Sequence, residues 1–286
     1  MAFPQLSSRY HSEILKEREW AAKHGGFRDR VRFDLVDRPQ YAFGVLAAAD
    51  IARFCGVGRI TVIEFGVAEG KGLFNLCALA EEVSHVTDVR IEVVGFDTGQ
   101  GLPRLEDYRD HPEIWSEGDF GGIGQELMES KLPYNARMVW GDVRDTLREA
   151  VRSLRSPVGF VANDLDLYSS TLASLSLFDA PIDKLLPVVI TYFDDTLGSP
   201  TRMGSLFRNR WCGQLAAIDD FNLSHQRRKI DQIRTLKARR PLDRELWLDQ
   251  MYAVHAFDHP LRQAGSRTQS MSMDAHGEHD RMAWPL

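Results

Sequence analysis

Four aspartates are the residues of this chain whose positions point most directly to chemistry. They form two pairs, each directly after an apolar run typical of a strand: Asp164 and Asp166, then Asp194 and Asp195. If the two runs are parallel strands of one sheet, both end at the same edge and the four carboxylates converge there. Converging carboxylates repel one another unless a cation or protons intervene. An all-oxygen donor set suits a hard cation such as Mg²⁺ or Ca²⁺.

Each pair also has a simpler interpretation. Asp164 could cap a helix that begins near Tyr168, since aspartate is a good N-cap. Asp194 and Asp195 could lie in a solvated loop. Taken together, two pairs after two strands favour the cation site. A cation there would lower the pKa of a bound hydroxyl and hold it in place, while a nearby carboxylate takes the proton.

A glycine-rich segment follows the apolar run at 60–65. It reads Glu64-Phe65-Gly66-Val67-Ala68-Glu69-Gly70-Lys71-Gly72. Its glycines allow a tight turn and bring backbone N–H groups close to a ligand. The next expected strand ends at Asp97, whose carboxylate can accept both hydrogen bonds of a ribose diol. A turn that binds nothing is the simpler alternative, and the ordered occurrence of the turn, Glu64 and Asp97 favours a cofactor site.

The spacing of this segment differs from the G-x-G-x-x-G of dinucleotide sites. It resembles E-x-G-x-x-x-G-x-G, the first motif of class I S-adenosylmethionine-dependent methyltransferases. The resemblance implies that the loop holds the methionine moiety of the cofactor and that Asp97 holds its ribose. The cofactor-binding residues it implies are Glu64, Gly66, Gly70, Gly72, Asp97, Thr98 and Asp142.

Four further segments resemble one branch of these enzymes, the macrocin O-methyltransferase (TylF) family. GFDTGQGLP at 95–103 looks like the family's GFDSFEGLP. WGDVRDTL at 140–147, DLDLYSST at 164–171 and DDTLG at 194–198 are similar to KGWFEDTLP, DGDLYEST and DDYG. Four segments in the same order make a specific pattern.

The family resemblance assigns roles to the four aspartates. Asp164, Asp194 and Asp195 would be ligands of a divalent metal, taken to be Mg²⁺, and Asp166 would be the general base. S-adenosylmethionine would carry the methyl group.

Strand-like and helix-like patterns alternate along the chain. Strands are expected at 60–65, 91–96, 136–140, 158–162 and 188–193, with weaker candidates at 214–218 and 251–257. Helices are expected at 8–23, 41–55, 71–82, 124–131, 143–154, 168–178 and 225–237. This alternation predicts an α/β fold in which helices cover both faces of a parallel sheet. We therefore expect a Rossmann-like, seven-stranded, mostly parallel sheet, the class I methyltransferase fold.

The bulk composition narrows the class of protein. With 286 residues and 43% hydrophobic content, the chain can bury one large core. The net charge is −6 and no long basic block occurs, so no nucleic-acid partner is expected. Three separated cysteines without a CxxC pair argue against a zinc knuckle and a disulfide framework. Without a signal-peptide core or a run of ~18 apolar residues, we expect a cytoplasmic protein without a membrane segment.

We divide the chain into three parts. Residues 1–58 are expected to form a helical lid or a homodimer contact, 59–262 the S-adenosylmethionine-binding domain, and 263–286 a flexible tail. The long connection after the second strand contains Trp115 and Phe120 and is expected to cover the cofactor or the acceptor.

The expected function is metal-dependent O-methylation of a small hydroxylated molecule, by resemblance a sugar moiety or a natural product. Two alternatives stay open, because a fold does not settle function. One is a protein that binds S-adenosylmethionine without methyl transfer, and the other is a related metal-dependent enzyme with hydroxylase-like chemistry. The product mass separates these alternatives: methyl transfer adds one methylene unit and hydroxylation adds one oxygen.

Overall fold

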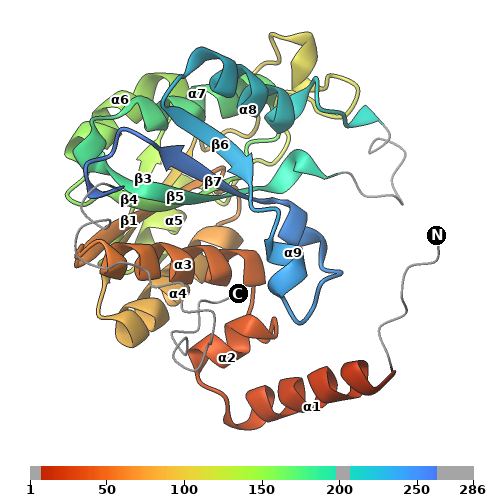
Figure 1. Ribbon diagram of the computed structural model, residues 1–286. Coiled ribbons are helices and arrows are strands. Elements are labelled where there is room, and N and C mark those ends of the chain that lie inside the picture. Colours follow the sequence, from red (N-terminus) through yellow and green to blue (C-terminus); the bar gives the residue numbers. More distant parts are fainter. Residues whose placement is uncertain (1–7, 198–206, 263–286) are drawn as a thin grey trace.

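The computed structural model describes residues 8–197 and 207–262 (Figure 1). The tail predicted at 263–286 lies outside this part of the chain. A seven-stranded sheet with the order β3-β2-β1-β4-β5-β7-β6 forms the centre. Its strands are β1 (Arg59–Phe65), β2 (Arg90–Asp97), β3 (Ala136–Trp140), β4 (Val158–Asn163), β5 (Leu185–Phe193), β6 (Arg228–Gln232) and β7 (Met251–Ala256).

The strand directions complete the topology. β1 to β5 pair in parallel, and β7 runs antiparallel to both β5 and β6. This order and the reversed β7 are those of the class I methyltransferase fold, so the expected fold is confirmed. The order of connection reverses between β1 and β4, which lie side by side. In open α/β sheets, ligands bind outside the carboxyl ends of the strands at such a switch point.

Helices cover both faces of the sheet (Figure 1). The main helices are α3 (Pro39–Phe54), α4 (Lys71–Thr87) and α5 (Gln125–Lys131) on one face, and α6 (Val143–Ser153), α7 (Tyr168–Leu175) and α8 (Gly213–Ser224) on the other. Two clusters of buried apolar side chains, one on each face, form the core. Every residue of β4 is buried, as expected for a strand between two helical layers. None of the described helices is long and apolar enough to cross a membrane.

The N-terminal segment has two parts with different packing. α3 lies on β4 and β5, and a Cβ at Gly44 would come within 2.2 Å of the Phe160 ring. This helix therefore packs directly on the sheet, and the division of the chain after residue 58 stays a prediction. α2 (Phe27–Arg32) packs on α3 and buries Phe27 and Val31, whereas α1 (Ser8–His24) lies farther from the sheet (Figure 1). The role of this segment as a lid or a dimer contact stays a prediction.

Two expected elements near the C-terminus are wrong. The strand expected at 214–218 is part of α8, whose buried face includes Ala216, Ala217 and Ile218. Three adjacent apolar residues are typical of a buried strand, but here they belong to a helix that packs against the sheet. In place of the helix expected at 225–237, the structure has the strand β6, followed by the short helix α9 (Leu236–Arg239). β6 buries only Ile230 among its residues, so its sequence shows no apolar alternation.

Candidate active site

A cavity of about 380 Å³ lies at the carboxyl ends of β1, β2, β4 and β5. Four of the predicted cofactor residues contribute to its wall: Gly66, Asp97, Thr98 and Asp142. All four residues of the predicted metal and base site also contribute: Asp164, Asp166, Asp194 and Asp195. The structure thus brings the cofactor loop and the acidic residues into one cavity at the switch point.

Gly66 joins the two halves of this cavity. Its φ of +83° is a left-handed conformation that favours glycine. Its backbone N–H donates to the Phe96 carbonyl at 3.0 Å. A Cβ at this position would lie 1.8 Å from the carbonyl oxygen of Asp164. The loop after β1 therefore touches the loop after β4 directly, and this contact leaves no room for a side chain.

Asp97 organises the cofactor loop itself. Its Oδ2 accepts hydrogen bonds from the backbone N–H groups of Val67 and Ala68, both at 2.8 Å. Its Oδ1 accepts a third from Gly99 N–H at 2.7 Å. A carboxylate has about four acceptor positions, so one remains free, on Oδ1. Asp97 thus keeps acceptor capacity on the side of the cavity, and its contact with a ribose diol stays a prediction.

Thr98 and Asp142 line the cavity beside Asp97. The Thr98 hydroxyl donates to the Gly101 carbonyl at 2.9 Å and so closes the turn after β2. Asp142 is the N-cap of α6: it accepts from Arg144 N–H at 2.8 Å and forms a 2.7 Å ion pair with the same residue. Both side chains thus have structural partners, and their contacts with a cofactor stay a prediction.

Three predicted cofactor residues lie behind the loop: the described residues that line the cavity do not include Glu64, Gly70 or Gly72. The Glu64 carboxyl is buried and accepts a hydrogen bond from the Tyr41 hydroxyl at 2.6 Å. Burial raises the pKa of Glu64 to about 7. Gly70 starts α4 with a φ of +86°, and Gly72 lies in the first turn of that helix. These three residues thus support the loop and the start of α4 on the side away from the cavity.

Three of the acidic residues form a compact cluster. One carboxylate oxygen from each of Asp164, Asp194 and Asp195 lies within 4.8 Å of the others. Burial and the charges of Asp194 and Asp195 raise the pKa of Asp164 well above its usual range. The pKa of Asp195 is also raised, mainly by burial. Carboxylates this close together repel one another unless a positive charge compensates them.

The surroundings of the cluster fit a divalent cation. The Tyr192 hydroxyl donates to Asp194 Oδ1 at 2.5 Å, and Asp195 N–H donates to Gln214 Oε1 at 2.8 Å. Asp195 Oδ1 forms an ion pair with Arg208 at 2.6 Å. Its Oδ2 is buried and has no hydrogen-bond partner among the described residues. Asp195 thus presents an unpartnered carboxylate oxygen beside the carboxylates of Asp164 and Asp194. Together they provide the all-oxygen donor set that Mg²⁺ or Ca²⁺ prefers.

Asp166 lies beside this cluster in an unusual backbone conformation. Its φ is +59°, a left-handed value that aspartate tolerates better than most residues. Only 9% of its surface is exposed. Burial and then the charge of Asp195 raise its pKa to about 9. A cation held by the neighbouring carboxylates would lower this pKa and favour the ionised form that a base requires.

The cavity wall also contains residues outside the predicted set. Arg208 donates to the Asp195 carbonyl at 2.7 Å, and its guanidinium lies 5.4 Å from the centre of the Trp115 ring. No motif marks Arg208 in the sequence, because it lies in a segment without regular structure. Trp115 and Phe120 line the cavity with ring centroids 5.6 Å apart, and the expectation that their loop covers the cofactor or the acceptor stays a prediction.

Comparisons with known proteins give structural likenesses alone. No protein-family model matches this chain, and no curated protein matches it. One similar solved structure is CalS11, a calicheamicin methyltransferase, at 20% identity over 78% of this chain and 86% of that one, with a TM-score of 0.45. Another is an O-methyltransferase from Bacillus cereus in complex with SAH, at 13% identity over 89% of this chain and 93% of that one, with a TM-score of 0.41.

Proposed function

We propose that this protein is an S-adenosylmethionine-dependent O-methyltransferase of the TylF type and that it uses a divalent cation, taken to be Mg²⁺. One observation carries the proposal. A single cavity at the β1/β4 switch point holds the cofactor loop, with Gly66 and Asp97, next to the cluster of Asp164, Asp194 and Asp195. A donor of methyl groups and a hydroxylated acceptor can thus meet in one enclosed space.

The cofactor side of this cavity is formed by backbone and by Asp97. S-adenosylmethionine supplies an electrophilic methyl group when bound. The loop leads into α4, whose N-cap Gly70 provides no side-chain cap, and the N-terminus of this helix would favour the carboxylate of a methionine moiety. Asp97 fixes the loop through Val67 and Ala68 and keeps one acceptor position for a ribose hydroxyl.

The acceptor side is formed by the acidic residues and the aromatic wall. A divalent cation held by Asp164, Asp194 and Asp195 would lower the pKa of an acceptor hydroxyl. In the proposed reaction the acceptor oxygen bonds to the methyl carbon as the carbon–sulfur bond breaks, and the hydroxyl proton goes to the Asp166 carboxylate. Trp115 and Phe120 add aromatic rings to the wall of the same cavity. Such a mixed wall suits a small molecule with hydroxyls and an apolar face, such as a sugar moiety.

The test is methyl transfer from labelled S-adenosylmethionine to a panel of sugars, glycosides and catechols in the presence of Mg²⁺. We expect a product heavier by one methylene unit and a higher melting temperature with S-adenosylhomocysteine, because a ligand of the native state stabilises it. A product heavier by one oxygen would replace methyl transfer with hydroxylation. A protein that does not bind S-adenosylhomocysteine would contradict the proposal altogether.

A further inference from the structure

The long connection between β2 and α5 forms the outer wall of the cavity. It contributes Leu102, Pro103, Trp115 and Phe120 to the lining. Within it, Leu102 N–H donates to the Asp119 carbonyl at 2.8 Å, and Gly118 N–H donates to the Leu102 carbonyl at 2.9 Å. These two bonds join the beginning and the end of the wall. The wall is thus one closed unit, and residues 106–110 attach this unit to the domain.

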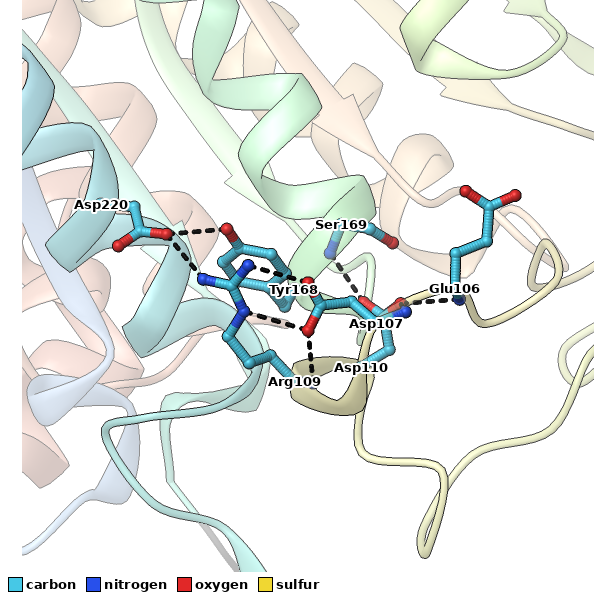
Figure 2. A network of polar contacts seen from close by, with 7 residues as sticks. All are labelled: Glu106, Asp107, Arg109, Asp110, Tyr168, Ser169 and Asp220. Atoms are coloured by element: carbon cyan, nitrogen blue, oxygen red, sulfur yellow. Dashed lines mark hydrogen bonds and ion pairs between the residues drawn. The ribbon is translucent and has the colours of Figure 1, made fainter.

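Asp110 attaches the wall to α7. Its side chain is fully buried, and its Oδ1 accepts the backbone N–H of Ser169 at 2.7 Å (Figure 2). The N-cap residue of α7 is Leu167, which has no side chain able to cap the helix. Asp110 therefore caps α7 from a loop 59 residues away in sequence. Its Oδ2 accepts from Glu106 N–H and Asp107 N–H at 3.3 and 3.2 Å and so closes the turn.

Arg109 attaches the same turn to α7 and α8 (Figure 2). Its Nε and Nη2 donate to the two oxygens of Asp107 at 3.0 and 2.8 Å, and its Nη1 donates to Asp220 on α8 at 2.9 Å. The guanidinium lies 3.7 Å from the centre of the Tyr168 ring on α7. The Tyr168 hydroxyl donates to Asp220 at 2.7 Å, so the three elements share one set of bonds.

The two helices that hold the wall, α7 and α8, also adjoin the acidic residues. α7 begins two residues after Asp166, and α8 carries Gln214, which accepts the backbone N–H of Asp195 at 2.8 Å. The Arg109 and Asp110 contacts, which we call the wall clamp, thus join Trp115 and Phe120 to the helices that hold the acidic cluster. The cofactor loop does not contribute to the clamp.

We infer that Arg109 and Asp110 are positioning residues for the acceptor: the wall clamp sets the distance between the aromatic wall and the acidic cluster. This inference rests on the proposed function. It predicts that loosening the clamp weakens acceptor recognition and leaves cofactor binding unchanged, because the loop at Gly66 has its own bonds to Asp97. The same change should loosen the wall itself, which is measurable without any acceptor.

Arg109→Met is the main test variant, since its guanidinium is partly exposed and a methionine fills the same space above Tyr168. Asp220→Asn is a second variant, which keeps the shape of the α8 partner and removes its charge. Arg210→Met is the matched control. Arg210 also pairs with an α8 aspartate, Asp219 at 2.8 Å, and also lies over an aromatic ring, that of Trp211, but its bonds among the described residues do not include the wall.

Hydrogen exchange of residues 112–122 and binding of S-adenosylhomocysteine are measured first. In Arg109→Met we expect exchange in this segment to be faster by about tenfold, with cofactor affinity within about twofold of wild type. Asp220→Asn should show a smaller increase, and Arg210→Met none. Unchanged exchange in Arg109→Met would overturn the inference whatever the activity of the enzyme.

Steady-state kinetics then separate positioning from general destabilisation. With an accepted hydroxylated substrate, Arg109→Met should raise the acceptor KM by about tenfold while the KM for S-adenosylmethionine stays constant. A parallel rise in both KM values would show that the clamp does not act on the acceptor side and would overturn the inference. If the wild-type protein transfers no methyl group, the proposed function fails, and the exchange data still decide whether the clamp holds the wall.

Discussion

Gly72 lies directly against the buried carboxyl group of Glu64. A Cβ at position 72 would be 1.9 Å from Glu64 Oε1, and the three nearest atoms it would meet all belong to that side chain. The last glycine of the cofactor motif therefore makes room for a carboxyl group beneath α4. Glu64 and Gly72 form one structural unit, which also includes the Tyr41 hydroxyl.

This unit predicts a coupling between the two positions. Gly72→Ala should destabilise the protein by about 1–3 kcal/mol, the usual cost of an overpacked core. In a Glu64→Ala background the same change should instead stabilise by up to ~1 kcal/mol, because alanine favours a helix more than glycine does. Urea unfolding of the four proteins in the cycle measures both effects. Equal costs in the two backgrounds would show that Glu64 is not what excludes a side chain at 72.

The pKa of Glu64 predicts how stability changes with pH. It is raised from 4.5 to about 7 in the folded protein, so folding favours the protonated carboxyl. The stability from this group is complete below pH 4.5, falls as the pH rises towards 7, and is then constant. The loss is about 3 kcal/mol for a shift of this size. Glu64→Gln should therefore be more stable than wild type above pH 7 by up to that amount.

Urea unfolding between pH 4.5 and 8 tests the pH prediction. The other titrating groups are common to both proteins, so the difference between wild type and Glu64→Gln isolates this carboxyl. Glu81→Gln, an exposed site on the neighbouring helix α4, is the control and should follow wild type. A difference between Glu64→Gln and wild type that does not change with pH would contradict the raised pKa.

The Asp97 contacts predict a graded loss of cofactor binding. Asp97→Ala removes the acceptor of three backbone N–H groups and the position left for ribose, so S-adenosylhomocysteine affinity and stability should fall together. A charge-assisted hydrogen bond is worth about 1.5–3 kcal/mol, and a loss near this range is expected. Asp97→Asn keeps one acceptor oxygen and should lie between wild type and Asp97→Ala. Calorimetry that shows wild-type affinity for both variants would remove Asp97 from the cofactor site.

The position of the site could be predicted because parallel strands end at one edge. Asp164 and Asp194 each follow an apolar run, and the geometry of a parallel sheet brings them together whatever the details of the loops. The same reasoning placed Gly66 and Asp97 beside them. The side chain of Glu64 instead contacts Tyr41 of α3 and Gly72 of α4, because the alternation of a strand points it to the face opposite Phe65, and its contact with a cofactor stays a prediction.

Other parts of the site depend on contacts that a sequence pattern does not contain. Arg208 reaches Asp195 from a segment without periodicity. Asp110 caps a helix that is 59 residues away, and such a cap leaves no local signature in either segment. β6 was missed for a similar reason, since a strand that buries a single side chain, Ile230, takes its structure from its pairing with β7.

The four aspartates should divide into two functional classes. One oxygen from each of Asp164, Asp194 and Asp195 lies within 4.8 Å of the others, whereas Asp166 lies beside this group with a pKa of about 9. If the three hold the cation, Asn substitutions at each should weaken Mg²⁺ binding in calorimetry, and high Mg²⁺ should partly restore the rate. Asp183→Asn is the control, since this exposed aspartate precedes β5 at the opposite edge of the sheet.

If Asp166 is the base, Asp166→Asn should keep Mg²⁺ and cofactor affinity and lose turnover by about 10²–10⁴-fold, the usual size of general-base catalysis. Excess Mg²⁺ should not rescue that variant, because the missing function is proton acceptance. Metal affinity and rate measured on the same preparation decide the assignment. A loss of Mg²⁺ binding in Asp166→Asn as large as that in Asp164→Asn would make Asp166 a ligand, and the base would then be another residue.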